Sequence, residues 1–232
     1  MSADEQKKKA ARAAADMVRA GMVVGLGTGS TATHLVKILG DEVRNGLAIR
    51  AIPTSEETRK LAIAEGIELI EPDEQTIIDI AIDGTDEVDG QLNLIKGGGG
   101  ALLREKIIAG SALKMVIIAD ASKKVAQLGA FPLPVEVDRF CWPLTVSRIR
   151  EVCEEQNLKN IDIALRQQEG GGVFRSDGGN YIADLCCGRI ADAAALHKGL
   201  IDIPGVIETG LFIDIADQVI LASADGLEIL GA

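Results

Sequence analysis

The alternation of two hydrophobic periods along the first half of the chain constrains its fold more than any other feature. Short apolar runs lie between segments in which apolar residues recur every three or four positions. The predicted strands are 22–26, 47–52, 67–70, 77–82, 92–95 and 113–119, and the predicted helices are 4–20, 30–46, 54–66 and 101–112. Thr54 or Ser55 can cap the third of these helices. Strands that alternate with helices indicate β-α-β units and a mostly parallel sheet.

The pattern changes at Phe131-Pro132-Leu133-Pro134, because two prolines around one residue mark a boundary or an edge strand. The residues beyond predict strands at 135–137, 161–166 and 181–185 and helices at 143–156 and 189–198. Apolar strands at 209–215 and 218–223 can rejoin the first sheet. We therefore expect an α/β chain in which a Rossmann-like domain (1–130 plus 208–232) carries a smaller α+β, ferredoxin-like domain (131–207).

Composition narrows the class of function. The 232 residues carry a net charge of −11, which disfavours binding to nucleic acid, and no apolar run approaches the roughly 18 residues of a membrane span. The first ten residues are polar and show no secretory signal. Four cysteines without a C-x-x-C spacing and only two histidines make a zinc site improbable and indicate a cytoplasmic protein with buried thiols.

The segment Gly25–Ala32 follows a predicted strand and contains three glycines and three hydroxyl side chains. Glycines allow close approach of the backbone to an oxyanion, and the next helix offers unpaired N–H groups, so this loop predicts phosphate binding. The run Gly27-x-Gly29-x-x-Ala32 also fits a dinucleotide fingerprint, but the acid expected at the end of the second strand is missing. A purely structural tight turn is the other alternative.

Two further loops follow strands. Asp83–Gly90 holds four acids, with Asp83 and Asp86 three positions apart, and its spacing does not suit calcium. An Asp-rich turn with solvated carboxylates is the alternative reading. Lys96–Gly100 places a cation and four glycines before a helix, in which Glu105 interrupts an apolar face. A surface position for Glu105, beside Arg104 and Lys106, remains open.

Ligands of parallel sheets bind beyond the carboxyl ends of the strands, so one cleft could collect all three loops. An anion-binding loop, two or three acids and a lysine suit proton transfer next to the carbonyl of a small phosphorylated molecule. In that chemistry Lys96 would stabilise an enediolate oxygen, and neither a metal nor a cofactor is expected.

These motifs, together with Ala119–Lys123 and Phe131–Val137, resemble type A ribose-5-phosphate isomerase over nearly the whole chain. The resemblance implies interconversion of D-ribose 5-phosphate and D-ribulose 5-phosphate in the pentose phosphate pathway, without cofactor, by a homodimer or homotetramer. The sequence departs from the family at Gly100 and Leu103, where Ala and Thr are usual, and matches it poorly over 138–160.

The resemblance also implies residue roles. Glu105 would shuttle the proton between C1 and C2, Asp83 would assist ring opening and proton movement, and Lys96 would steady the enediolate. Lys7 is a weaker phosphate candidate, because Lys8 and Lys9 make its alignment ambiguous. The residues expected to bind substrate are Thr28, Gly29, Ser30, Thr31, Asp83, Gly84, Thr85, Asp86, Lys96, Gly97, Gly98, Gly99 and Lys123.

Two rival functions remain open at this point. A non-catalytic sugar-phosphate sensor would bind the ligand without turnover and would need a DNA-binding segment, for which no spare basic helix is visible. A nucleotide-dependent oxidoreductase would bind nicotinamide, which the missing ribose acid disfavours.

Overall fold

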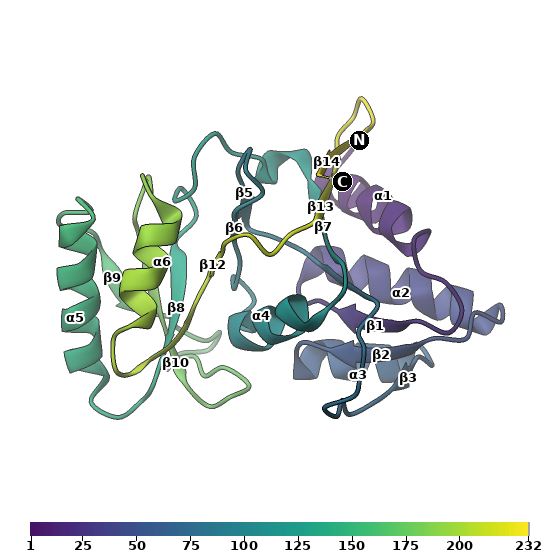
Figure 1. Ribbon diagram of the computed structural model, residues 1–232, viewed down its shortest axis with the longest axis horizontal. Coiled ribbons are helices and arrows are strands. Elements are labelled where there is room, and N and C mark those ends of the chain that lie inside the picture. The colour runs from purple at the N-terminus through teal and green to yellow at the C-terminus, as the bar shows by residue number, and fades with distance from the viewer. Residues whose placement is uncertain (232) are drawn as a thin grey trace. The chain divides into compact units, whose positions relative to one another are not determined.

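The computed structural model of the protein describes residues 1–231 and divides into two compact units (Figure 1). The first unit comprises Met1–Thr85, Arg104–Lys124 and residues from Ile215 onward, and the second comprises Asp86–Leu103 and Val125–Asp214. Each unit has its own sheet and its own apolar core.

The first unit is built on a seven-stranded sheet in the order β14-β13-β7-β4-β1-β2-β3. All neighbouring strands in it are parallel except the β13–β14 pair, which forms an antiparallel edge. The strands are β1 (Val23–Leu26), β2 (Arg50–Pro53), β3 (Glu68–Leu69), β4 (Ile80–Asp83), β7 (Met115–Asp120), β13 (Gln218–Ala222) and β14 (Leu227–Gly231). The mostly parallel sheet confirms the predicted Rossmann-like architecture.

Helices cover both faces of this sheet because its strands are apolar on both sides. The helices are α1 (Ala3–Ala15), α2 (Ser30–Arg44), α3 (Glu56–Ala64) and α4 (Leu102–Ser111), and a 3₁₀ turn, η1, spans Ala121–Lys123. The side chains of Val24 and Leu26 share a core with α1 and α2. Gly25, between them in the strand, points to the opposite face, where Ile108 of α4 packs.

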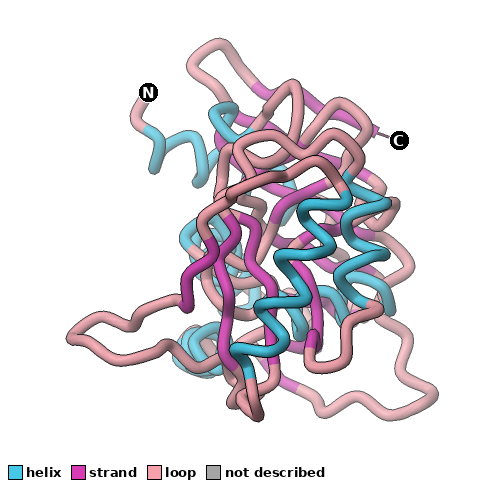
Figure 2. The backbone as a smooth tube through the Cα atoms, turned by 90° about the vertical axis from the view of Figure 1, so that its left-hand side faces the viewer, coloured by secondary structure: helices cyan, strands magenta, loops and turns pink. Residues whose placement is uncertain are grey.

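The second unit contains a four-stranded antiparallel sheet in the order β11-β8-β10-β9. Its elements are β8 (Leu133–Val137), α5 (Trp142–Glu155), β9 (Ile163–Leu165), β10 (Tyr181–Leu185), α6 (Ala193–Ile201) and β11 (Val206–Thr209). The two helices lie side by side in Figure 2 and bury Ile149 and Leu196 in the core of this unit. This β-α-β-β-α-β order agrees with the predicted ferredoxin-like α+β fold.

A three-stranded sheet, β5 (Glu87–Val88), β6 (Leu94–Ile95) and β12 (Leu211–Phe212), completes the second unit. The prediction that 209–215 rejoins the first sheet is therefore wrong: Leu211 pairs with Ile95, and Val206–Thr209 pairs with β8. Of the last predicted strands, β13 alone joins the seven-stranded sheet.

The observed units also differ from the predicted division into 1–130 plus 208–232 and 131–207. Residues 86–103, 125–130 and 208–214 group with the second unit. The reason is backbone pairing between distant segments, since Val125 N–H donates to the Val88 carbonyl and Lys96 N–H donates to the Gly210 carbonyl. Such pairing leaves no mark in local hydrophobic periodicity.

Candidate functional site

The predicted anion-binding loop lies in the first unit, where the chain leaves β1 and enters α2. Gly29 precedes the helix with a φ of 99°, a conformation that favours glycine. No side chain caps this end of α2. The turn therefore presents backbone N–H groups and the positive end of the helix dipole, as an anion site requires.

Asp83, at the end of β4, lies directly against this loop. Its Oδ1 accepts hydrogen bonds from the backbone N–H of Thr28 at 3.0 Å and of Gly84 at 2.7 Å. The side chain is only 2% exposed. Gly84 in turn approaches Thr28 and Thr31. The structure thus brings together two of the three predicted loops within one unit.

Buried hydroxyl groups hold the loop from the side of β2 and α3. The Oγ1 atoms of Thr28 and Thr54 are 2.7 Å apart, and Thr54 also donates to the Leu26 carbonyl. Thr58 donates to the Gly27 carbonyl at 2.9 Å. From the sequence, Thr54 and Ser55 were expected only to cap a helix. Ser55 does cap α3, and Thr54 has the further role of fixing the loop.

Lys7 is the lysine of the N-terminal run that reaches the loop. Its Nζ donates to Ser30 Oγ at 3.0 Å from α1. Lys8 and Lys9 instead line a shallow hollow with Glu5 and Arg12. This contact makes Lys7 the lysine of the run that lies nearest to the predicted anion-binding loop, while its phosphate role stays a prediction.

Glu105 lies in the first turn of α4 and is 4% exposed, so the alternative of a surface position is wrong. Together with Asp83, Gly27 and Thr54 it borders one enclosed gap that is too small to admit a water molecule. Two buried carboxylates therefore lie beside the predicted anion-binding loop in the first unit, an arrangement that suits proton transfer on a small anion.

The neighbour of Glu105 anchors the start of α4. Arg104 Nη1 donates to Glu56 Oε1 at 2.9 Å, and this hydrogen bond lowers the pKa of the Glu56 carboxyl.

The predicted substrate residue Lys123 lies in a separate turn of the first unit. It ends the η1 turn that follows β7 and is half-buried. Asp120 Oδ1 accepts from the backbone N–H of Ser122 and so fixes that turn.

In the second unit Lys96 follows β6 and is 2% exposed. Its Nζ lies 5.5 Å from the centre of the Phe212 ring, which stabilises the ammonium group by a cation–π interaction. A lysine enclosed in this way is held in one place, as a residue that stabilises developing charge must be.

The glycine loop after Lys96 is also fixed within the second unit. Gly98 N–H donates to Asp86 Oδ2 at 2.8 Å, and Gly100 N–H donates to the Gly97 carbonyl. Gly97 and Gly100 have φ values of 102° and 81°, which explains the choice of glycine at both positions. Gly98 and Gly99 are exposed, so the loop presents its backbone at the surface of this unit.

The remaining acids of the Asp83–Gly90 segment have structural roles. Both carboxylate oxygens of buried Glu87 accept backbone N–H groups, from Gly129 at 2.7 Å and from Phe131 at 2.6 Å. Asp89 accepts from the N–H groups of Gln91 and Asn93 and closes a turn. The Asp-rich-turn reading is therefore right for Asp89 and not for Asp83.

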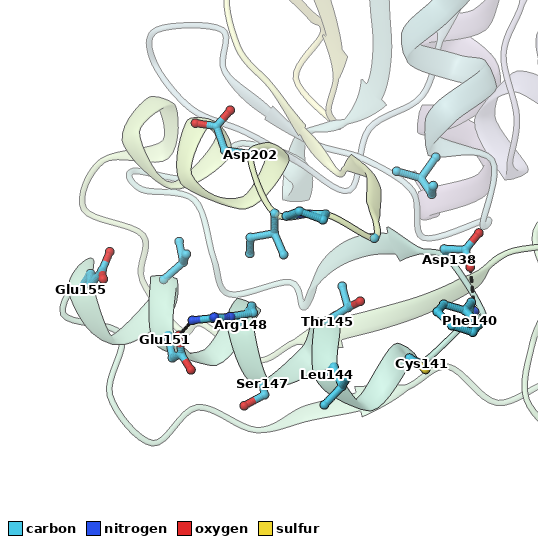
Figure 3. Close-up of a pocket in the computed structure, with 15 residues that line it drawn as sticks. Asp138, Phe140, Cys141, Leu144, Thr145, Ser147, Arg148, Glu151, Glu155 and Asp202 are labelled. Carbon is cyan, nitrogen blue, oxygen red and sulfur yellow. Dashed lines mark hydrogen bonds and ion pairs between the residues drawn. The ribbon is translucent and has the colours of Figure 1, made fainter.

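A larger hollow of the second unit holds none of the predicted site residues (Figure 3). It lies between α5 and the chain that enters β11, with exposed Phe140 and Leu144 at its rim and the Arg148–Glu151 ion pair beside it.

Within residues 1–231, no group of three or more His, Cys, Asp or Glu side chains is arranged to hold a metal ion. None of the helices in this range combines the length and apolarity that a membrane span requires.

The fold and these groups define a class: an α/β protein with a glycine-rich loop at the carboxyl end of its sheet and buried carboxylates beside that loop. Comparison with known proteins then gives the family. A model described as ribose 5-phosphate isomerase A (phosphoriboisomerase A) matches residues 50–226. The chain belongs to this family.

Relatives from other organisms match this chain over its full length. A ribose-5-phosphate isomerase A from Rhodopseudomonas palustris is 50% identical over 230 residues, which cover 99% of each chain. The structure of ribose 5-phosphate isomerase A from Methanocaldococcus jannaschii matches with a TM-score of 0.91 at 39% identity and covers both chains completely. A D-ribose-5-phosphate isomerase solved in complex with phospho-erythronic acid matches with the same score, identity and coverage.

Proposed function

We propose that the chain catalyses the reaction of its family, the interconversion of D-ribose 5-phosphate and D-ribulose 5-phosphate, by proton transfer through an enediolate. The observation that carries the mechanism is the close approach of two buried carboxylates, Glu105 and Asp83, next to the Gly27–Thr31 loop. The chain's own groups supply a base, an anion site and a second carboxylate there.

The loop Thr28–Thr31 binds the phosphate of the substrate, with Ser30, Thr31 and the N-terminus of α2 as donors. The contact of Lys7 with Ser30 adds a cation to this site. Holding the phosphate fixes one end of the open-chain sugar, and this restriction supplies part of the rate enhancement.

Glu105 is the base. Its carboxylate removes the proton from C2 of the open-chain aldose, and the electron pair of the broken C–H bond moves into a C1–C2 double bond while the carbonyl oxygen becomes negative. The same carboxyl group returns the proton to C1, and a proton passes between the oxygens on C2 and C1, which yields the ketose. A positioned base of this kind contributes roughly 10²–10⁴-fold.

The other predicted residues bind and stabilise. Asp83 assists ring opening and the proton movement between oxygens, and Lys96 stabilises the negative enediolate. Asp86 holds hydroxyl groups of the sugar, and Lys123, Gly84, Thr85 and Gly97–Gly99 complete the contacts with the substrate. Buried, fixed charges such as Lys96 stabilise a developing oxyanion without reorganising during the reaction.

The proposal extends to ligand, assembly and location. A relative at 39% identity binds phospho-erythronic acid, a phosphorylated sugar acid, which supports a sugar phosphate as the ligand here. Two or four copies per assembly and a cytoplasmic location follow from the family resemblance. The net charge of −11 argues against nucleic acid or an anionic membrane as a partner.

The test is conversion of ribose 5-phosphate to ketose by the purified protein in the presence of a metal chelator. We expect multiple turnovers and an equilibrium mixture of the two sugar phosphates. Binding of ribose 5-phosphate without any ketose would contradict the proposal and favour a sensor.

A further inference from the structure

Arg166 follows β9 and makes four side-chain hydrogen bonds within the second unit. Its Nε and Nη2 donate to the two carboxylate oxygens of Asp184 at 2.9 and 2.5 Å. Its Nη1 donates to the carbonyl oxygens of Gly97 at 2.7 Å and of Gly98 at 3.0 Å. One side chain thus links the β9–β10 pair to the glycine loop after Lys96.

These bonds determine the direction of the loop's backbone. In a trans peptide the C=O and N–H groups point to opposite sides. The peptide between Gly97 and Gly98 is held at both ends, since its carbonyl accepts from Arg166 and its N–H donates to Asp86. The next peptide has its carbonyl on Arg166, so the N–H of Gly99 points away from that side chain.

Consecutive glycines do not hold a conformation by themselves, because glycine has the largest backbone freedom of any residue. Only the planar fork of a guanidinium group can pair with a carboxylate on one edge and still reach two carbonyls with its third nitrogen. Arg166 is 14% exposed and Asp184 is 23% exposed, so this ion pair is partly shielded from water.

Phe174 supports the same arrangement from a third position. Its ring centre lies 5.9 Å from Arg166 Cζ, and a Cβ atom on Gly100 would come within 2.5 Å of its Cζ. The ring therefore packs against both the guanidinium group and the end of the glycine loop.

We propose that Arg166 is a positioning residue for the isomerisation. It acts through the loop and does not touch the substrate: by holding the carbonyls of Gly97 and Gly98 it directs the N–H of Gly99 toward a substrate oxygen. This inference rests on the proposed function, which assigns Gly97–Gly99 to substrate binding. A donor fixed before the reaction stabilises an oxyanion at no cost of reorganisation.

The experiment compares Arg166→Ala with the matched variant Arg150→Ala. Arg150 belongs to the same unit and also donates to a backbone carbonyl, that of Ile161 at 2.9 Å, but far from the loop in sequence. We expect kcat with ribose 5-phosphate to fall about 10- to 100-fold in Arg166→Ala, with a partial return on adding guanidinium ion. Arg150→Ala should keep kcat within about twofold, because no catalytic group depends on it.

Thermal unfolding of each variant separates positioning from folding. A folded Arg166→Ala protein with unchanged kcat and only a lower melting temperature would overturn the inference. If Arg166→Ala does not fold, Arg166→Lys and Asp184→Asn are tested in its place, since both retain part of the hydrogen bonding. Unchanged kcat in these folded variants would likewise overturn the inference. If the wild-type protein is inactive, the proposed function itself is contradicted. If the wild type is active and the Arg166 variants are unaffected, only the inference about Arg166 is contradicted.

Discussion

At the residue scale, Gly27 makes the closest approach to Asp83. A Cβ atom at this position would lie 2.1 Å from Asp83 Oδ1 and 2.6 Å from its Cα, so the backbone of β4 would have to move. We expect Gly27→Ala to lower the free energy of unfolding by about 1–3 kcal/mol and to reduce kcat, because Asp83 is displaced. Urea unfolding and the isomerase assay measure the two effects.

Gly110 provides the matched control for Gly27. It lies in α4, and a Cβ atom there would meet nothing within 4 Å. Gly110→Ala should therefore leave kcat unchanged and raise stability by up to about 1 kcal/mol through helix propensity. Equal stability of the two variants would contradict the close packing of Gly27 on Asp83.

The residue scale also shows what local sequence can and cannot predict. Glu105 was found because it interrupts an apolar helical face, and its burial confirms that reading. Arg166 carries no such signal: it is 69 positions from Gly97, and neither the glycine loop nor the strand before Arg166 records their contact. The same holds for Thr58, whose bond to the Gly27 carbonyl spans 31 positions.

At the scale of elements, α1 reaches the proposed anion site through one residue, Lys7. We expect Lys7→Gln to raise KM for ribose 5-phosphate several-fold with little change in kcat. Lys7 bonds to Ser30 in the proposed phosphate loop and has no part in the proposed proton transfer. The difference in KM between this variant and wild type should shrink at high salt, because salt screens the attraction between the lysine and the phosphate. Lys8→Gln is the control, and an equal rise of KM in that variant would argue against a specific role of Lys7.

The junction of β2 and α3 supports the same loop. Thr54→Val removes a buried hydroxyl that bonds to Thr28 and to the Leu26 carbonyl. The change should cost about 1–3 kcal/mol of unfolding free energy, because it leaves buried polar atoms without this partner.

Thr33→Val is the matched change for Thr54→Val. Its hydroxyl donates only to the Gly29 carbonyl, in an exposed backbone contact of α2, so the effect on stability should be small. Denaturant unfolding of both variants gives the comparison, and a loss in Thr33→Val as large as in Thr54→Val would show that burial of the Thr54 network is unimportant.

Most elements could be predicted from the sequence, because periodicity and caps are local. The helix predicted for 143–156 is observed as Trp142–Glu155, and Ser55 caps α3 as expected. The helix predicted for 189–198 begins later, at Ala193, because the side chain of Asp192 accepts from Ala195 N–H. The edge strand β14 was not predicted, since its side chains are mostly exposed and lack a clear alternation with burial.

At the scale of the whole molecule, the four cysteines divide into two classes. Cys141 and Cys186 are exposed, whereas Cys153 and Cys187 are buried. Burial raises the pKa of Cys153 to about 11 and that of Cys187 to about 12. At pH 8 we expect a thiol reagent to modify two thiols quickly and the other two only after unfolding. Equally fast modification of all four thiols would contradict the burial of Cys153 and Cys187 in the core of the second unit.

The raised pKa values of Cys153 and Cys187 also predict how the stability of the protein changes with pH. The pKa of each buried thiol in the folded protein lies above its usual value of 9.0, so the contribution of the protonated thiols to folding stability is fully present below pH 9. It is lost as the pH rises from about 9 toward 12, where the unfolded thiols ionise first. Thermal melting across this range should show a falling midpoint, and replacement of Cys187 by Ala should reduce the slope.

The division into two units was the least predictable feature at this scale. The prediction that Phe131–Pro134 marks a boundary or an edge strand is wrong, because β8 begins within this segment and pairs with both β10 and β11. The pairing of β12 with β6 joins residues more than a hundred positions apart. Hydrophobic pattern predicts that each of these runs is a strand and does not say which strand it pairs with.

The most direct test of the account is the loss of the C2 hydrogen of ribose 5-phosphate, followed by NMR in wild type, Glu105→Gln and Glu136→Gln. Glu136 is the matched control, a carboxylate 1% exposed that bonds to Ser176 and Asn180 in the second unit. The account predicts at least a 10²-fold slower loss in Glu105→Gln and a rate near that of wild type in folded Glu136→Gln. Loss of the C2 hydrogen at the wild-type rate in Glu105→Gln would contradict the assignment of Glu105 as the base.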